Sequence, residues 1–313
     1  MTERNGDIPT RELGATGERV SLLGVGGAHI GAAKLSAGEG IRIIQAAIDG
    51  GATFLDNAWE YHDGESERRM GAALSEGGYR QRAFLMTKDC AHDRRADHSM
   101  EKLEDSLRRL KTDHLDLWQI HEVVWEDDPD KIFAPGGSAE SLLKAKEQGK
   151  VRFIGFTGHK HPDIHRRMLS HGFPFDTVQM PLNVLDAHHA SFEREILPIC
   201  QEQGIAVLGM KSQAGGHLLR ESGTGITAAE ALRYAMSLPV ATVISGMDSM
   251  EILEQNLATA RALVPLSAEE RADLLSRSAA ASEGGRFEPF KSTRNYEGGE
   301  GRRAHNYPEK AAD

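Results

Sequence analysis

The feature that most constrains the fold is a regular alternation of short apolar runs with amphipathic segments along most of the chain. Eight runs have the length and composition of buried strands, and each precedes a segment with apolar residues at helical spacing. Such alternation forces parallel strand pairing through right-handed crossovers. The predicted strands are residues 22–25, 53–55, 83–87, 115–120, 151–156, 177–180, 206–210 and 242–245. The predicted helices are residues 39–50, 65–75, 97–110, 138–148, 163–170, 192–203, 228–237 and 250–263.

Two closures of such a sheet compete, an open doubly wound sheet and a barrel. The open dinucleotide-binding sheet places G-x-G-x-x-G at its first turn, but here Gly24 and Gly26 are followed by His29 at the last position. Eight strand–helix units in 313 residues favour a (β/α)8 barrel. Residues 11–13 and 20–25, around a turn at residues 14–17, predict an N-terminal β-hairpin.

The chain divides into three predicted segments. Residues 1–9 form a polar leader, and residues 10–278 form a single (β/α)8 barrel domain. Residues 279–313 form an irregular tail rich in Gly, Arg and Glu, which either covers the barrel mouth or stays partly disordered.

The composition narrows the classes of partner that this protein is expected to bind. The formal net charge of −10 disfavours nucleic acid and anionic membranes. No apolar run approaches the roughly 18 residues of a membrane helix, and the polar start contains no signal-like stretch. We therefore expect a cytoplasmic protein acting on a small molecule, and the pattern leaves its oligomeric state open. Cys90 and Cys200 are the only cysteines, and there is no H-E-x-x-H motif among the 14 histidines, so no metal site is expected.

Polar residues stand where three consecutive predicted strands end. Asp56 and Tyr61 follow the second strand, Lys88 ends the third, and His121 follows the fourth. Barrel enzymes keep their chemistry at this carboxyl-terminal rim. The four side chains are therefore expected to lie together and to form a catalytic tetrad.

The set has a chemical logic for carbonyl reduction. Hydride addition to a carbonyl forms an alkoxide, which needs a proton, and Tyr61 can donate one as general acid. Lys88 would lower the tyrosine pKa, and Asp56 would keep the buried lysine charged. His121 can donate a hydrogen bond that orients the carbonyl oxygen.

Each residue also has a structural explanation. Asp56 could cap a turn, Tyr61 could be a core aromatic, Lys88 could pair with a surface acid, and His121 could be a core histidine. Their joint position on three adjacent strand ends favours the catalytic interpretation.

The chain resembles the aldo-keto reductase family over roughly residues 10–265. The resemblance rests on the opening R-E-L-G-x-T-G, on G-A-T-F-L-D-N-A leading to Tyr61, on L-D-L leading to His121, on K-V-R-F-I-G at residues 150–155, and on residues 231–234 and 244–256. It implies a (β/α)8 reductase that uses NAD(P)H on an aldehyde or ketone, with the tetrad in the roles given above.

The resemblance also implies a cofactor site at the barrel mouth. Residues after the fifth and sixth strands would hold the nicotinamide, the loop after the seventh would approach the pyrophosphate, and residues 246–256 would hold the adenosine. The implied cofactor residues are Gly27, Thr157, Gln179, Met210, Lys211, Gly246, Asp248, Ser249 and Asn256. Trp59 and Trp125 are the candidates for lining the substrate pocket.

The sequence departs from the family pattern in the cofactor region. Gly158 stands where the family usually has asparagine, and Met210 stands where it has an aromatic residue that stacks on nicotinamide. NADPH is the family default, but Gly246, Ile252 and Asp248 replace the basic residues that would meet its 2′-phosphate. Because an acid suits a ribose hydroxyl, NADH is the alternative cofactor.

Two other functions remain open at this level. One is a binding subunit that senses the nucleotide with vestigial activity. The other is a Schiff-base aldolase acting through Lys88, which would need no nicotinamide.

Overall fold

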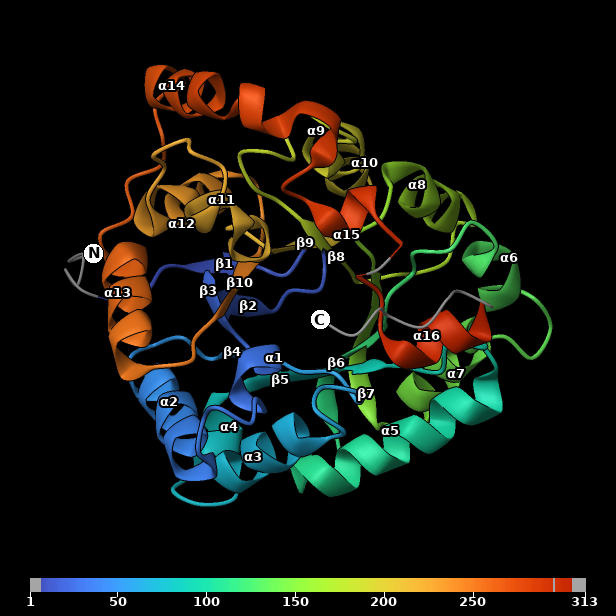
Figure 1. Cartoon of the computed structure of the whole chain (residues 1–313). Helices are drawn as coiled ribbons and strands as arrows, with labels where there is room; N and C mark the ends of the chain where they lie inside the picture. The colour runs from blue at the N-terminus through green and yellow to red at the C-terminus, as the bar shows by residue number, and fades with distance from the viewer. Residues whose placement is uncertain (1–6, 295, 306–313) are drawn as a thin grey trace.

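The computed structural model describes residues 7–294 and 296–305 and contains a closed barrel of eight parallel strands (Figure 1). The strand order around the barrel is β10-β3-β4-β5-β6-β7-β8-β9. The barrel strands are β3 (Leu23–Gly26), β4 (Phe54–Asp56), β5 (Phe84–Asp89), β6 (Leu115–Ile120), β7 (Val151–Thr157), β8 (Thr177–Pro181), β9 (Ala206–Met210) and β10 (Thr242–Gly246). The predicted barrel class is confirmed.

The strand register brings the predicted site to one rim. Gly26 pairs with Asp56 at the end of β3 and β4, and Lys88 pairs with Gln119 near the end of β5 and β6. Thr157 pairs with Gln179 near the end of β7 and β8. Since all strands are parallel, their carboxyl ends open on the same mouth.

Helices surround the barrel and bury their apolar faces against it (Figure 1). For example, a capping box of Ser36 and Glu39 starts α2 and satisfies backbone donors of its first turn. The helices before the tail are α1 (Gly27–Ile30), α2 (Ala37–Asp49), α3 (Glu65–Leu74), α4 (Tyr79–Arg82), α5 (Ala96–Leu110), α6 (Asp128–Ile132), α7 (Ser138–Glu147), α8 (Pro162–Ser170), α9 (Phe192–Glu195), α10 (Leu197–Glu202), η1 (Ala214–Gly216), α11 (His217–Arg220), α12 (Ala228–Ser237), α13 (Met250–Arg261) and α14 (Ala268–Ser278).

Two predicted elements are divided in the structure. The run 192–203 forms two helices, α9 and α10, because Pro198 lies in the first turn of α10 and has no N–H to continue the preceding helix. The run 20–25 is divided between a hairpin strand, β2 (Arg19–Ser21), and β3.

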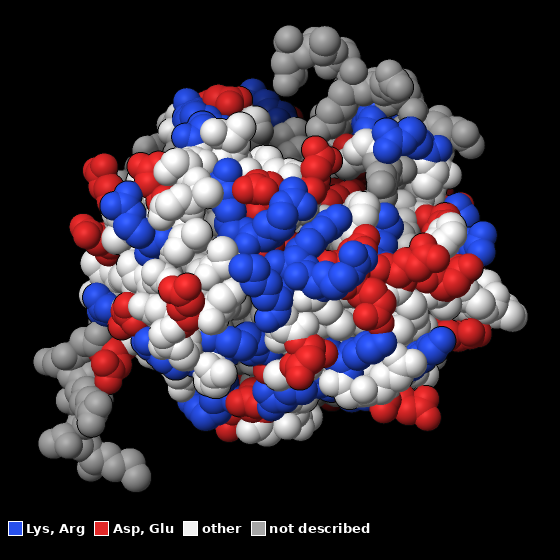
Figure 2. Space-filling model, turned by 90° about the horizontal axis from the view of Figure 1, so that it is seen from below, with Lys and Arg blue, Asp and Glu red and all other residues white. Residues whose placement is uncertain are grey.

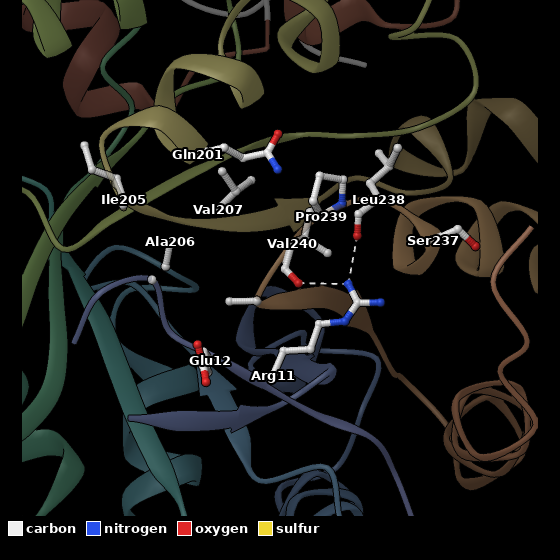
Figure 3. A pocket seen from close by; sticks show the side chains of 13 residues that line it. Arg11, Glu12, Gln201, Ile205, Ala206, Val207, Ser237, Leu238, Pro239 and Val240 are labelled. Carbon is white, nitrogen blue, oxygen red and sulfur yellow. Dashed lines mark hydrogen bonds between the residues drawn. The ribbon is translucent and has the colours of Figure 1, made fainter. Parts of the chain in front are cut away.

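The predicted hairpin closes the end of the barrel opposite the mouth. Its strands are β1 (Thr10–Glu12) and β2, which pair antiparallel. Arg11 reaches the loop between α12 and β10 and donates to the carbonyl oxygens of Leu238 at 2.8 Å and Val240 at 2.9 Å (Figure 3). A surface cavity of about 480 Å³ lies here, but none of the tetrad lines it. We therefore treat this cavity as separate from the predicted catalytic site.

The interior of the barrel beneath the mouth is filled by side chains. Phe54 stacks on Phe84 with ring centroids 4.8 Å apart, and Phe84 stacks on Phe153 at 6.3 Å. Met86, Leu117 and other alternate strand residues belong to the same cluster. This packed layer leaves the mouth as the open end.

The tail beyond α14 follows the barrel surface toward the mouth. Its short helical turns are η2 (Ala280–Gly285), α15 (Pro289–Ser292) and α16 (Gly299–Ala304), and Figure 1 shows them crossing the face turned to the viewer. Lys291 is buried and contacts Asp186 at 2.5 Å and Glu288 at 3.0 Å, which anchors α15 beside β8. Residues 1–6 of the predicted leader and 306–313 of the predicted tail lie outside the described residues. The domain bounds stay a prediction.

Basic side chains gather on the face that carries α3 and α5, with acidic side chains around them (Figure 2). Several are paired, such as Arg68 with Glu65 at 3.0 Å and Arg109 with Glu67 at 3.2 Å. Among residues 7–294 and 296–305, no helix combines the length and the apolar character needed to cross a bilayer.

Candidate active site

A cavity of about 540 Å³ opens at the barrel mouth and collects most of the predicted site. It is lined by the carboxyl ends of β4, β8, β9 and β10, by the loops that follow them, and by Tyr296 of the tail. The sequence-predicted residues in its lining are Gly27, Asp56, Tyr61, Gln179, Met210, Lys211, Gly246, Asp248 and Asn256. The fold thus brings most of the residues predicted from the sequence to the mouth of the barrel.

Asp56, Tyr61 and Lys88 form one network, in which Asp56 and Lys88 are buried and Tyr61 is half-buried. The Lys88 side chain is 1% exposed and makes an ion pair with Asp56. Its ammonium also donates to the Asn57 carbonyl oxygen at 2.8 Å and to the Tyr61 hydroxyl at 3.4 Å. Each charge in this network has a partner, which a buried charge requires.

The Tyr61 hydroxyl lies near acidic groups at the barrel mouth. Burial, followed by the negative charges of Asp56 and Glu60, raises the pKa of the Tyr61 hydroxyl well above its ordinary value. The expectation that Lys88 acts in the opposite direction on this pKa stays a prediction. Tyr61 therefore holds its proton firmly, as a donor must.

His121 stands beside Tyr61 at the same rim. The two rings meet edge to face with centroids 5.7 Å apart. His121 Nδ1 lies 2.8 Å from a carboxylate oxygen of Glu60 and 3.3 Å from the Cys90 sulfur. Glu60 also contacts His92 Nε2 at 3.2 Å.

Sequence reasoning missed Glu60 and His92. The available signal was position: Glu60 immediately precedes Tyr61, and His92 lies four residues after Lys88. Neither belongs to a motif, and only the folded loops bring them to His121.

Gln179 joins the tetrad to the cofactor region. Its amide nitrogen donates to Asp56 at 2.6 Å, whereas its amide oxygen is buried and has no hydrogen-bond partner among the described residues. A buried acceptor without a partner is costly, and a carboxamide N–H of a ligand would satisfy it. The residue therefore fits the nicotinamide contact that the sequence suggested.

Close packing explains why position 158 is a glycine. A Cβ at this position would lie 2.3 Å from the Val123 carbonyl oxygen and 2.6 Å from the His165 ring. An asparagine here would therefore require the Val123 backbone or the His165 ring to move. Thr157 is buried at the end of β7 but does not line the cavity.

The loop after β9 carries Met210 and Lys211 into the cavity, together with Tyr296 of the tail. Lys211 Nζ lies 3.5 Å from the Tyr296 hydroxyl and 4.9 Å from its ring centroid, with Phe290 at 5.3 Å on another side. His159 packs edge to face on Tyr296 and Phe290. The tail thus brings an aromatic residue into the cavity that Met210 also lines, which sequence reasoning did not foresee.

The far end of the cavity is built around β10 and α13. Asp248 is paired with Lys34 at 2.5 Å, and the His29 ring occupies the space that a side chain at Gly246 would need. Ser249 caps α13 by accepting from the Ile252 N–H, and so it lies at the helix N-terminus without lining the cavity. Asn256 donates to Ser245 Oγ at 3.1 Å.

The charge balance of the cavity suits a phosphate-bearing ligand. Asp56 and Asp248 are the acids among its lining residues, and each is paired with a lysine. The lining also contains Lys211 and Arg220. Positive charge is therefore available without an unpaired acid opposing it.

The two predicted substrate-pocket tryptophans lie elsewhere. Trp59 faces a separate surface hollow, donates to Asp105 at 3.3 Å and has the Lys102 ammonium 3.2 Å from its ring centroid. Trp125 is 4% exposed and stacks on His305 at 4.3 Å. Neither lines the mouth cavity.

Comparison with known proteins identifies the family of the chain. The sequence profile of the aldo/keto reductase family matches residues 22–230. The aldo-keto reductase YhdN of Bacillus subtilis is 31% identical over 206 residues, covering 62% of this chain and 58% of that relative, so the match spans less than two thirds of that relative's length. L-galactose dehydrogenase of Arabidopsis thaliana is 25% identical over 299 residues, covering 84% and 91%. The holo form of an aldo-keto reductase from Bacillus halodurans superposes with a TM-score of 0.73 at 27% identity, covering 86% and 96%.

The chain has a (β/α)8 barrel with polar residues at the carboxyl ends of its strands. The chain belongs to the aldo/keto reductase family, whose members reduce small carbonyl compounds with NAD(P)H.

Proposed function

We propose that this protein reduces an aldehyde or ketone to the alcohol at the mouth cavity, with NADPH as the preferred cofactor. One observation carries the proposal. Asp56 and Tyr61 line the same cavity as Gln179, whose buried amide oxygen has no partner among the described residues, and the acids that line this cavity are paired with lysines. When bound, the cofactor supplies the hydride that adds to the carbonyl carbon.

The side chains handle the proton and the orientation. Tyr61 donates its hydroxyl proton to the carbonyl oxygen as negative charge develops there. Lys88, 3.4 Å from that hydroxyl, stabilises the phenolate that forms, and Asp56 holds the lysine in place. His121, at the edge of the tyrosine ring, directs the carbonyl oxygen toward the donor.

The cofactor residues follow from the lining. Gln179 would accept from the carboxamide, Met210 with Tyr296 would cover the nicotinamide, and Lys211 would approach the pyrophosphate. The N-terminus of α13, capped by Ser249, offers backbone N–H groups and a favourable dipole at the adenosine end.

The NADPH preference rests on the pairing of Asp248. Because Lys34 compensates this acid at 2.5 Å, a 2′-phosphate would not face a free negative charge. The NADH alternative requires that Asp248 instead accept from the ribose hydroxyls.

The aldolase alternative fits the geometry less well. A Schiff-base lysine attacks as the neutral amine, whereas Lys88 is held by an ion pair and two further contacts. Borohydride trapping with substrate would detect such an adduct, and we expect none.

Cofactor oxidation with a panel of small aldehydes and ketones tests the function, alongside fluorescence titration with NADPH and NADH. We expect turnover and an NADPH Kd at least about tenfold below that of NADH, a difference of ~1.4 kcal/mol. Cofactor binding without turnover of any carbonyl would favour the nucleotide-sensing subunit, and tighter NADH binding would reverse the cofactor assignment.

A further inference from the structure

A cluster of three buried ionisable groups attaches the tail beside the mouth cavity. Lys291 lies in α15, Glu288 immediately precedes this helix, and Asp186 lies in the loop after β8 (Figure 1). The Lys291 ammonium is 2.5 Å from an Asp186 oxygen and 3.0 Å from a Glu288 oxygen. Each of the three side chains is at most 1% exposed. We call these three residues the α15 cluster.

The formal charges of the α15 cluster do not cancel, because two carboxyl groups face one ammonium. A further hydrogen bond of the Lys291 ammonium goes to the neutral carbonyl oxygen of His189 at 3.0 Å. A buried charge without a partner is costly, so protonation of one carboxyl group is favoured. Burial raises the pKa of the Asp186 carboxyl to about 7, with the Lys291 charge opposing the shift and the Glu288 charge adding to it. The α15 cluster therefore exchanges a proton near neutral pH.

The groups around the α15 cluster leave this imbalance in place. Glu193 of α9 donates its backbone N–H to Asp186 at 3.0 Å, and its carboxylate accepts from the Tyr234 hydroxyl of α12 at 2.7 Å. The same carboxylate forms an ion pair with Arg271 of α14, which compensates the charge of that arginine. Other titratable side chains nearby are His188 and His189 in the loop of Asp186, and Lys211 in the loop after β9.

Two contacts connect the α15 cluster to the cofactor cavity. The Asn183 amide nitrogen donates to Glu288 at 3.0 Å and to the Lys211 carbonyl oxygen at 3.2 Å. Phe290 of α15 is fully buried and packs edge to face on Tyr296, with ring centroids 5.6 Å apart. Lys211 and Tyr296 both line the cavity, where the lysine ammonium is 3.5 Å from the tyrosine hydroxyl. A displacement of α15 would therefore disturb both lining residues.

We propose that the residues of the α15 cluster are positioning residues, which seat Tyr296 and Lys211 at the cofactor cavity through one bound proton and hold them less firmly as the pH rises from 6 to 8.5. The inference rests on the proposed NADPH site and deepens it by adding a control on cofactor binding.

The direction of this pH dependence follows from the two states of the tail. With α15 docked, Asp186 keeps its proton up to about pH 7, whereas in water it would lose the proton at its ordinary pKa of about 4. Docking is therefore most favourable below about pH 4, and this advantage is lost as the pH rises to about 7.

Hydrogen exchange of the full chain, followed by mass spectrometry, tests the proposal without any ligand. The amides of Lys291, Ser292 and Thr293 report on docking, because they donate to the carbonyl oxygens of Glu288 and Pro289. Their protection, corrected for the intrinsic effect of pH, should fall by about tenfold between pH 6 and pH 8.5 in the wild type. Unchanged protection in the wild type would overturn the proposal, whatever any variant does.

Glu288→Gln should remove this pH dependence. A single carboxylate, that of Asp186, then balances the Lys291 ammonium, so α15 protection should change by less than about threefold between the two pH values. Glu283→Gln is the matched control, because it makes the same change at an exposed position of the same tail and should behave as the wild type. An equal fall in protection in Glu288→Gln and in the wild type would contradict the role of the α15 cluster.

The NADPH dissociation rate provides a readout that a purely structural helix would not change. It is measured by stopped flow, with a chase of excess NADP⁺, at pH 6 and pH 8.5. The rate should rise between these pH values by about tenfold more in the wild type than in Glu288→Gln. The comparison of the two proteins cancels the effect of pH on NADPH itself. The same pH dependence in both proteins would contradict the positioning of Tyr296 and Lys211 by α15.

Failure of this inference and failure of the proposed function are distinguishable. If the wild type binds no nicotinamide cofactor and turns over no carbonyl, the proposed function is wrong, and hydrogen exchange still decides whether one proton controls the docking of α15. If the wild type reduces carbonyls and Glu288→Gln matches it in exchange and in NADPH dissociation at both pH values, only the role of the α15 cluster is wrong.

Discussion

The half of the barrel mouth built by β4, β5 and β6 contrasts with the half built by β8, β9 and β10. In the first half, polar groups are paired with one another: Lys88 with Asp56, and Glu60 with His121 and His92. The second half supplies most of the lining of a cavity of about 540 Å³, which Asp56 and Tyr61 also line, and its Gln179 amide oxygen has no partner among the described residues. One half is organised before any ligand arrives, and the other is shaped to receive one.

In the proposed function, this difference separates two tasks in hydride transfer. Proton donation needs groups held in fixed charge states, which buried pairs provide. Cofactor binding needs space and unsatisfied donors or acceptors, which the second half retains. Substitutions in the first half should therefore change the chemical step, and those in the second half should change binding or folding.

The largest effect is expected for Lys88→Met. The substitution removes the cation of a buried ion pair and leaves Asp56 with Gln179 as its remaining side-chain partner. We expect a loss of about 3–5 kcal/mol in the free energy of unfolding and a fall in kcat of at least about 10²-fold. Chemical denaturation and steady-state kinetics measure the two effects.

Lys150→Met is the matched control for that variant. Lys150 pairs with Glu104 on the surface, where both side chains are partly exposed, so we expect a change within about 0.5 kcal/mol. If Lys88→Met were as stable as this control, the buried pair would not have the role assigned to it.

Gly158→Asn should destabilise the fold by about 1–3 kcal/mol, because its Cβ would clash with the Val123 carbonyl and the His165 ring. The thermal melting temperature measures this loss. Gly172→Asn is the control, since nothing lies within 4 Å of a Cβ there and asparagine tolerates its positive φ. A stable Gly158→Asn protein with tighter cofactor binding would show that the loop after β7 can adopt the family's usual conformation.

Lys34→Met should weaken NADPH binding by about tenfold, or ~1.4 kcal/mol, and NADH binding by less. The reason is that Asp248 loses the lysine that compensates it at 2.5 Å and then opposes the 2′-phosphate. Lys131→Met, which breaks a surface pair with Asp127 at 2.6 Å, should leave both Kd values unchanged. Equal losses in affinity for the two cofactors would mean that Asp248 does not determine the preference between them.

The smallest effect at neutral pH is expected for His165→Phe. The side chain contacts the rings of Phe156 and Phe192, so a phenyl ring should change stability by less than about 1.5 kcal/mol at pH 7. Burial lowers the pKa of His165 to about 3, so the unfolded chain binds a proton that the folded one does not. The wild type should lose stability as the pH falls from 6.5 toward 3, and the variant should lose less.

Denaturation of both proteins at pH 7 and near pH 4 measures that difference. Parallel pH dependences would mean that His165 does not contribute to acid sensitivity.

The barrel and the proton-handling half were predictable because their signals are local. Strand runs end in Asp56, Lys88 and His121, and parallel strands must bring those ends to one rim. What sequence could not supply is the packing across loops. Glu60 and His92 meet only in the folded molecule, and the tail that brings Tyr296 to Lys211 lacks any periodic pattern.

Contacts across loops also explain the points at which the structure adds to the sequence expectations or differs from them. The pKa of Tyr61 depends on its burial and on the nearby charges of Asp56 and Glu60, a matter of distances that no spacing encodes. Asp248 weakens the expectation of NADPH when only the sequence is considered, whereas in the structure Lys34, 214 positions earlier in the chain, pairs with this acid. Trp59 follows β4 closely yet packs against Asp105 on the outer side.

Single-turnover stopped flow of Tyr61→Phe beside the wild type tests the central claim most directly, with each protein preloaded with saturating NADPH and mixed with one good carbonyl substrate. The account predicts that the variant consumes bound NADPH at least about 10²-fold more slowly, with an NADPH Kd within about twofold of the wild type. Consumption at the wild-type rate would contradict the assignment of Tyr61 as the proton donor, and loss of NADPH binding would contradict the separation of the two halves.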